Sequence, residues 1–319
     1  MNVLWIMTDE QNASCLPGDR PDLRAPNLDR LRRSGITFTR AYANSPICGP
    51  SRMSFITGTH PHTHGMTGNL CFDLPGPMPE TLPLVFRRAG FETGLAGKSH
   101  SVGSWDEAAY DFIRYSDIID SPARDPAANH YFAHLIEHGL ADEFDLGVPE
   151  GYDFRPFVSR VPREHSLERW TGDRALEFLR NRDRTRPFLL NLSFQRPHDP
   201  LSLCPDEELL YDPDALTLPD SVSDLFERDF SGHHDLVRGR VHSPDYAFPL
   251  VPRSEHDLRN ALAHYYHLIT RIDEEIGRVL GELERSGELD ETVIVFASDH
   301  GDFAGEHGLM IKGLAIYES

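Results

Sequence analysis

The sequence predicts an α/β fold in which a mostly parallel central sheet is flanked by helices on both faces. Three short runs, at 3–7, 187–194 and 292–297, are rich in apolar, strand-forming residues. Continuous apolar character is typical of strands that are buried on both faces, as in a parallel sheet. Segments with helical spacing alternate with these runs along the chain, which favours the βα connections of such a sheet.

The composition is that of an ordinary globular protein, because 39% of its 319 residues are hydrophobic and 26% are charged. Acidic residues outnumber basic ones by 51 to 31, which gives a formal charge of −20. Such a surface repels nucleic acid and anionic membranes, so neither is expected as a partner. An anionic substrate would need a local cluster of basic side chains.

The four cysteines, Cys15, Cys48, Cys71 and Cys204, match neither a zinc-finger spacing nor a disulfide scaffold. The sequence shows no signal-peptide pattern and no apolar stretch long enough to cross a membrane. We therefore expect a cytoplasmic protein with reduced thiols.

The first strand, 3–7, ends in two acidic residues, Asp9 and Glu10. Leu28 and Leu31 then indicate a short helix up to Gly35, and the alternation over 36–43 predicts a second strand. Paired acids are common in loops. At the carboxyl end of a parallel strand, however, they lie where open α/β sheets bind ligands.

The pentapeptide Cys48-Gly49-Pro50-Ser51-Arg52 follows, and the apolar run behind it predicts a helix that begins at Pro50 or Ser51. Cys48 would lie at the helix N-terminus, where unpaired N–H groups and the helix dipole favour an anion. Arg52 adds a permanent cation one turn along. The plain structural alternative is a buried cysteine in front of an ordinary helix.

Polar residues also follow the later predicted strands. The strand at 91–97 runs into Lys98 and His100, the strand at 187–194 is followed by His198, and the strand at 292–297 is followed by Asp299 and His300. Helices are predicted over 81–89, 166–181 and 254–285, and loop-rich insertions over about 101–165 and 204–252. A surface Lys-Ser-His and a turn histidine are the plain alternatives for the first two of these polar clusters.

The pentapeptide, with Thr57-Gly58 behind it, resembles the C-x-P-S-R signature of type I sulfatases in the alkaline phosphatase superfamily. Further matches follow in the family's order, with G-K-x-H at 97–100, P-H-x-P at 197–200 and S-D-H-G at 298–301. The resemblance implies an alkaline phosphatase-like or sulfatase-like sheet. It also implies that residues 1–319 are an N-terminal catalytic domain that is truncated, because sulfatases continue into a smaller C-terminal subdomain.

In this family the cysteine is oxidised to formylglycine by a formylglycine-generating enzyme, which would be a transient partner. The hydrated aldehyde supplies the oxygen that attacks sulfur or phosphorus. The resemblance implies that Arg52 stabilises the modified residue and that Lys98 and Lys312 bind substrate oxygens. It also implies that His198 or Lys312 protonates the leaving oxygen. His100 would remove a proton when sulfate departs.

The resemblance also implies a metal site built from Asp9, Glu10, Asp299 and His300, together with the modified Cys48. Carboxylates brought together repel one another, so a divalent cation is their natural neutraliser. The oxygen ligands favour Ca²⁺, while the histidine leaves Mn²⁺ and Mg²⁺ open. Glu10 departs from the family pattern, in which the first strand ends in Asp-Asp or Asp-Gln.

The function expected from the sequence is hydrolysis of a small anionic ester by a sulfatase. A phosphonate monoester or phosphodiester hydrolase of the same superfamily is the first alternative, because sulfate and phosphate esters share a tetrahedral geometry. A catalytically inactive or incomplete binding homologue is the second. Aryl sulfates, sulfated sugars and choline-type esters all remain open as substrates.

Overall fold

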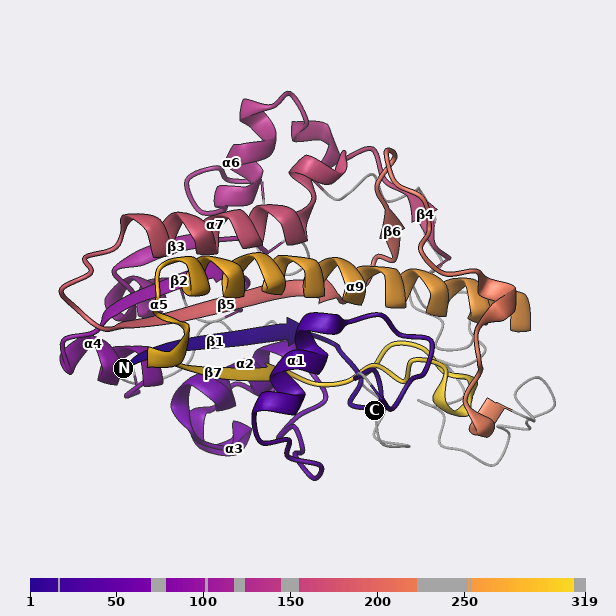
Figure 1. Cartoon of the computed structure of the whole chain (residues 1–319), viewed down its shortest axis with the longest axis horizontal. Helices are drawn as coiled ribbons and strands as arrows, with labels where there is room; N and C mark the ends of the chain where they lie inside the picture. The colour runs from indigo at the N-terminus through magenta and orange to yellow at the C-terminus, as the bar shows by residue number, and fades with distance from the viewer. Residues whose placement is uncertain are drawn as a thin grey trace.

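The centre of the protein is a five-stranded parallel sheet with the strand order β3-β2-β5-β1-β7 (Figure 1). The strands are β1 (Asn2–Asp9), β2 (Glu92–Gly97), β3 (Phe112–Tyr115), β5 (Phe188–Pro197) and β7 (Thr292–Ser298). This computed structural model describes residues 1–16, 18–69, 79–100, 103–117, 124–144, 155–222, 252 and 254–312.

Helices cover both faces of the sheet, as the sequence predicts. On one face, α7 (Leu167–Asn181) and α9 (Glu255–Arg285) pack over β5 and against each other. Leu4 and Ile6 of β1 join that core, whereas Trp5 points to the opposite face, where its ring lies 6.1 Å from that of Phe55 in α2. The alternating side chains of one strand are therefore buried on both sides.

The helices around these layers are short. α1 (Pro26–Ser34) packs on α9, and α4 (Leu82–Arg88) packs on β2. The remaining helices and strands are α2 (Cys48–Thr57), α3 (Pro61–His64), α5 (Gly103–Ala109), α6 (His130–Glu137), β4 (Phe157–Val158) and β6 (Ser202–Leu203). In the described part of the chain, no helix is both long enough and apolar enough to pass through a bilayer.

Three expectations about the elements were wrong. The strand predicted over 36–43 is irregular, and its apolar side chains Ile36 and Phe38 are mostly exposed, because no described strand lies beside it to supply hydrogen bonds. The helix α2 begins at Cys48, two or three residues earlier than predicted. The strand β3 lies inside the segment expected to be loops and short helices.

The structure describes part of each predicted insertion. Within 101–165 the structure describes α5, β3, α6 and β4, and most of 204–252 lies outside the described residues. The interpretation of 1–319 as one N-terminal catalytic domain stays a prediction.

Candidate active site

Four neighbouring strands end at the same edge of the sheet and deliver polar residues there. Asp9 closes β1, Lys98 and His198 directly follow β2 and β5, and Asp299 directly follows β7. The backbone ties the ends together: the N–H of His198 donates to the carbonyl of Asp9 at 3.1 Å, and the N–H of Asp299 donates to that of Thr8 at 3.1 Å. The predicted convergence is therefore present.

Gly97 shows how close these strand ends come. Its φ is +111°, and a Cβ at this position would lie 1.8 Å from the carbonyl oxygen of Ser193 on β5. Only glycine fits such an approach without displacing the backbone. The contact sets the next residue in place, because the N–H of Lys98 donates to the same oxygen at 2.9 Å.

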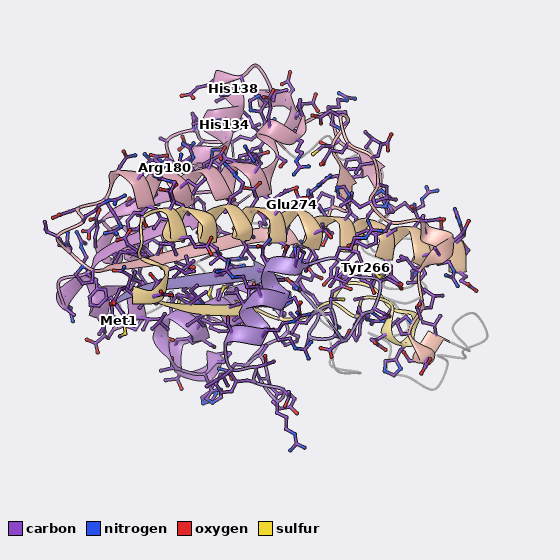
Figure 2. The ribbon with its side chains drawn as sticks, viewed as in Figure 1. Met1, His134, His138, Arg180, Tyr266 and Glu274 are labelled. Atoms are coloured by element: carbon purple, nitrogen blue, oxygen red, sulfur yellow. The ribbon has the colours of Figure 1, made fainter. Side chains whose placement is uncertain are left out.

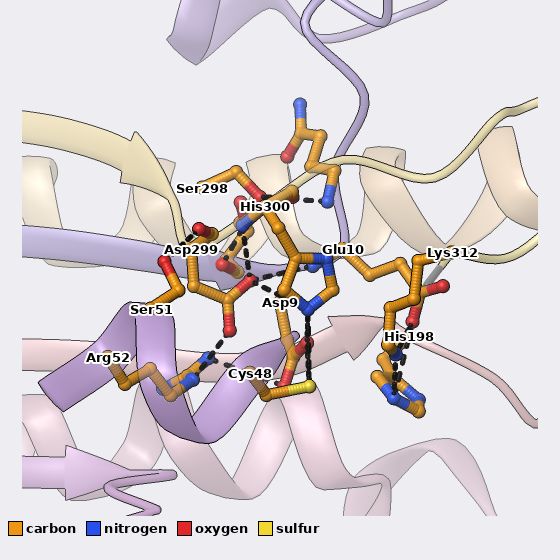
Figure 3. Close-up of polar contacts among 12 residues, drawn as sticks. Asp9, Glu10, Cys48, Ser51, Arg52, His198, Ser298, Asp299, His300 and Lys312 are labelled. Atoms are coloured by element: carbon orange, nitrogen blue, oxygen red, sulfur yellow. Dashed lines mark hydrogen bonds and ion pairs between the residues drawn. The ribbon is translucent and has the colours of Figure 1, made fainter. Parts of the chain in front are cut away.

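Cys48 is the first residue of α2, and its side chain is fully buried among site residues (Figure 3). Its Sγ lies 3.2 Å from His300 Nε2 and 3.5 Å from Asp9 Oδ1. The N–H of Gly49 donates to Asn69 Oδ1 at 2.9 Å, which fixes the first turn of the helix. The thiol is therefore held among metal-ligand side chains and not in hydrocarbon.

Positive charge nearby alters the acidity of this thiol. Burial and the Asp9 carboxylate raise the pKa of Cys48, but Lys98, Lys312 and His300 outweigh them and lower it to about 7. A pKa below the ordinary value means that these cations stabilise negative charge at the position of the sulfur.

Arg52 faces the carboxylates more closely than it faces the thiol. Its Nε donates to Asp299 Oδ2 at 2.6 Å, and its Nη1 donates to Ser193 Oγ at 2.8 Å and to the carbonyl of Lys98 at 3.0 Å. Its Nη2 lies 3.4 Å from Asp9 Oδ2. These contacts make Arg52 a positioning residue for the acidic pair, beyond the role that the sequence suggested beside residue 48.

Lys98 forms a fully buried ion pair with Asp9, with 2.8 Å between Nζ and Oδ2. Burial would raise the pKa of Asp9, but the cations Lys98, His198 and Arg52 hold it well below its usual value. Burial likewise opposes the charge on Lys98, yet Asp9 raises the pKa of the amine above its usual value. Both side chains are therefore charged at neutral pH.

Lys312 and His198 share a second cluster with Glu10. Lys312 Nζ lies 2.5 Å from Glu10 Oε2 and 2.5 Å from His198 Nε2, and His198 Nδ1 lies 2.8 Å from the carbonyl oxygen of Asp199. Burial and Lys312 lower the pKa of His198, but Glu10 and Asp199 outweigh them, so the pKa lies well above its ordinary value. His198 is therefore protonated at neutral pH and able to donate a proton.

His100 is buried and has a positive φ of 58°. Burial and the Lys98 cation lower its pKa to about 4, and Asp117 opposes them only partly. The imidazole is therefore neutral at neutral pH and able to accept a proton. The catalytic role inferred from the sequence stays a prediction.

The donor set at the sheet edge fits a divalent cation. Ligand atoms of Asp9, Cys48, Asp299 and His300 all lie within 4.8 Å of one another, and all four residues are buried. Asp9, Glu10 and His198 form a second such group that shares Asp9, and Glu10 Oε1 is buried without a hydrogen-bond partner. Carboxylate oxygens, a thiol and an imidazole are donor types that divalent cations bind in proteins.

Glu10 differs from the other predicted ligands in its contacts. Its N–H donates to Asp299 Oδ1 at 3.0 Å, while its carboxylate pairs with Lys312 and lies 3.2 Å from His198. The structure thus places Glu10 next to the group around Cys48 and not within it. The side chain of Glu10 is one methylene longer than the aspartate of the family pattern, and the backbone of Glu10 has a positive φ of 69°.

Several residues that hold the site were missed from the sequence. Ser193 binds Arg52, and Asp302 accepts from the N–H of Ile311 at 2.8 Å and so anchors the loop that carries Lys312. The Tyr265 hydroxyl donates to the carbonyl of Glu10 at 2.6 Å. Ser193 lies at the end of a predicted strand, which was a usable signal; a tyrosine inside a long helix gave none.

The fold and site define a member of the alkaline phosphatase superfamily, and comparison with known proteins narrows this to one family. The family model "Sulfatase" matches residues 1–316. The chain therefore belongs to the sulfatase family.

Among curated relatives, the multifunctional alkaline phosphatase superfamily protein PehA of Trinickia caryophylli and an arylsulfatase of Clostridium perfringens are each 30% identical to this chain, over 98% of it. A choline-sulfatase of Rhizobium meliloti is also 30% identical. The chain spans about 65% of the length of the first two relatives and 59% of the third.

Solved structures share the fold. The phosphonate monoester hydrolase of Agrobacterium radiobacter superposes with a TM-score of 0.75 at 20% identity, covering 99% of this chain and 66% of that one. A structure titled BT4656 in complex with D-glucosamine-2-N,6-O-disulfate superposes with a TM-score of 0.66 at 23% identity, covering 97% of this chain and 67% of that one. At these identities the likeness supports the architecture and not a substrate.

Proposed function

We propose that this protein hydrolyses sulfate esters through residue 48 after its oxidation from cysteine to formylglycine, with a divalent cation bound at the sheet edge. The observation that carries the proposal is the position of Cys48. Its Sγ is buried at the start of α2, 3.2 Å from His300 and 3.5 Å from Asp9, in a site whose cations stabilise negative charge.

Two groups complete the chemistry. The formylglycine hydrate supplies an oxygen nucleophile at the position where the thiol now lies. A divalent cation, when bound, would lower the pKa of that nucleophile and offset the negative charge of the ester. Asp9, Asp299 and His300 would hold the cation together with residue 48, and Ca²⁺ is our first assignment because carboxylate oxygens dominate the set. His300 keeps Mn²⁺ and Mg²⁺ open.

The side chains of this protein bind the ester and stabilise the charge that develops on it. Lys98 pairs with the Asp9 carboxylate, and Lys312 pairs with the Glu10 carboxylate. Both ammonium groups are positioned to bind ester oxygens and to stabilise the negative charge that develops on them. Arg52 holds the Asp9 and Asp299 carboxylates in position and does not contact the ester directly.

Proton transfers are assigned to the remaining two positions. Lys312 Nζ and His198 Nε2 lie 2.5 Å apart, and the raised pKa of His198 keeps it protonated, so this pair can protonate the departing oxygen. His100, neutral because of burial and Lys98, can accept the proton released when the aldehyde is restored. These two steps require opposite protonation states at the outset, and the surroundings of the two histidines favour those states.

The experiment is a paired assay with an aryl sulfate and an aryl phosphonate monoester, supported by metal analysis of the purified protein. A sulfatase turns over the sulfate ester with the higher kcat/KM. The alternative, a phosphonate monoester hydrolase, predicts the reverse order of kcat/KM.

Cys48→Ala is the matched negative control. It removes the nucleophile and leaves the carboxylates, Arg52 and the lysines in place, so turnover should vanish while the far-UV circular dichroism spectrum is retained. Full activity in this variant would refute the nucleophile assignment. Absence of modification and turnover in the wild-type protein would support the reading as an inactive homologue.

The remaining assignments accompany the same proposal. The partner is a formylglycine-generating enzyme that acts once on residue 48, and the substrate is a small anionic ester. A cytoplasmic location is supported by the free thiols at the described cysteines, Cys15, Cys48 and Cys204. The acidic surface supports the absence of nucleic-acid and membrane partners.

A further inference from the structure

A second cluster of metal-ligand side chains lies away from the sheet edge. His134 lies in the last turn of α6, His138 caps that helix, and His165 ends the short turn of residues 163–165. One donor nitrogen from each ring lies within 4.8 Å of the others, and the cluster shares no residue with the two groups around Asp9. Figure 2 shows His134 and His138 at the periphery of the molecule, beyond α7.

From this arrangement we propose a zinc site with three imidazole ligands, formed by His134, His138 and His165. The first two ligands are four residues apart, so they share one face of the helix. The third comes from a segment 27 or more residues further along the chain. A bound ion would therefore join α6 to the turn that precedes α7.

The distances match what zinc requires. Zn–N bonds of 2.0–2.1 Å in a tetrahedron place ligand nitrogens about 3.3 Å apart. His134 Nε2 lies 3.1 Å from His165 Nδ1, and the ring centroids of His138 lie 4.3 Å from those of both other histidines. Small side-chain rotations are enough to bring three nitrogens to one centre.

The second ring nitrogens are arranged as metal-bound histidines usually are. His138 Nδ1 lies 2.8 Å from the carbonyl oxygen of His134 and donates to it, which leaves Nε2 of His138 as the ligand atom. His165 Nε2 lies 3.6 Å from the carboxylate of Glu164, which leaves Nδ1 as the ligand atom. The carbonyl behind His138 fixes its tautomer, as second-sphere acceptors of metal-bound histidines do, and the nearby carboxylate favours a proton on Nε2 of His165.

Buried packing holds the two segments together without an ion. The Tyr131 hydroxyl donates to the carbonyl of His165 at 3.0 Å, and the Tyr131 ring is fully buried between Phe144 and Trp170. The ligands are thus preorganised, which lowers the entropic cost of binding.

The ligand type selects zinc over the cation expected at the sheet edge. Three neutral imidazoles suit Zn²⁺ and are poor ligands for Ca²⁺ or Mg²⁺, which take oxygen donors. Three protein ligands also leave the fourth position of a tetrahedron open for water or an anion. The next residue, Ser166, caps α7, and α7 packs on β2 and β5, so an ion here would brace the helix behind the strands that carry Lys98 and His198.

The test is a zinc titration of the metal-free 319-residue chain in competition with a chromophoric chelator. The wild-type protein is compared with His138→Ala, whose side chain is exposed, and with His165→Ala. Each variant should lose the same single equivalent, with an affinity at least about 100-fold weaker, because each lacks one of three ligands. Added zinc should raise the melting temperature of the wild-type protein more than that of either variant.

The double variant His60→Ala/His62→Ala is the matched control. It removes two exposed, stacked histidines, with ring centroids 5.6 Å apart, that belong to none of the three-donor groups in the described residues. It should bind zinc as the wild-type protein does. Equal zinc stoichiometry and affinity in the wild-type protein and both single variants, or the same loss in the control, would overturn the proposal. Neither outcome depends on whether residue 48 is catalytic.

Discussion

Arg52 provides a sharp test of how the acidic pair is held together. The side chain is only 3% exposed, and both carboxylates that it faces, Asp9 and Asp299, are fully buried. Arg52→Met keeps most of the volume but removes the charge and the donors to Asp299, Ser193 and the Lys98 carbonyl. It leaves two buried carboxylates, with Lys98 2.8 Å from Asp9 and the His300 ring 3.6 Å from Asp9 and 3.7 Å from Asp299.

The contacts set the magnitude. One charge-assisted hydrogen bond of about 1.5–3 kcal/mol and two ordinary ones of about 0.5–1.5 kcal/mol each amount to roughly 2.5–6 kcal/mol. Breaking a buried ion pair from one side costs about 3–5 kcal/mol, which lies in the same range. We therefore expect the metal-free variant to lose about 3–5 kcal/mol of unfolding free energy.

The assay is urea denaturation of the metal-free protein, repeated with Ca²⁺. Because the cation supplies the charge that Arg52 no longer provides, Ca²⁺ should stabilise the variant more than the wild-type protein. Arg30→Met is the matched control: its pair with Glu284 is about half exposed on both sides, so removal should cost about 0–1 kcal/mol. A loss of under about 1 kcal/mol for Arg52→Met would refute the reasoning, since it would equate a buried pair with a surface one.

Three further predictions concern single residues. In unmodified protein, the thiolate absorbance of Cys48 should rise with a midpoint near pH 7, because the nearby cations lower the pKa of this thiol. Cys48→Ala should abolish that signal. A midpoint at the ordinary thiol value of about 8.5 would contradict the account. Gly97→Ala should lower the unfolding free energy in urea by about 2–5 kcal/mol, because the new Cβ would clash with the backbone of β5. Gly139 also has a positive φ but faces open space, so Gly139→Ala should cost about 1 kcal/mol. Equal losses in the two variants would refute the clash. Lys312→Met should lower the kcat of the folded protein about 10²–10⁴-fold, and it should also lower the stability, because the buried Glu10 carboxylate loses its lysine partner. An unchanged kcat would remove Lys312 from proton transfer.

The buried strands and the residues at their ends could be predicted from the sequence. Continuous apolar runs have one simple explanation in a parallel sheet, and the polar residue that follows each run must then lie at its carboxyl edge. This is why Asp9, Lys98, His198 and Asp299 were found together. The order of the strands came only from the structure, because pairing depends on contacts between distant segments.

Local patterns failed where the tertiary context decided. The alternation over 36–43 suits a strand, but no described neighbour pairs with it, so it stays irregular. Conversely, β3 was missed because Arg114 interrupts its apolar run and all four of its residues are only partly buried. The partner of Glu10 could not be predicted either, since Lys312 lies 302 residues away.

The zinc cluster gave an even weaker signal. His134 and His138 have helical spacing, but they lie in a segment of poor periodicity, and His165 is separated from them by a stretch without a clear pattern. Only the packing of Tyr131 beneath the turn at 163–165 brings the third imidazole within reach.

The most direct test of the central claim is turnover measured against the modified fraction of residue 48. Preparations made with different amounts of formylglycine-generating enzyme are quantified by peptide mass spectrometry, in which oxidation of cysteine to formylglycine lowers the mass by about 18 Da. Sulfate ester hydrolysis should rise in proportion to that fraction and extrapolate to zero in unmodified protein. Activity that is independent of the fraction would contradict the account.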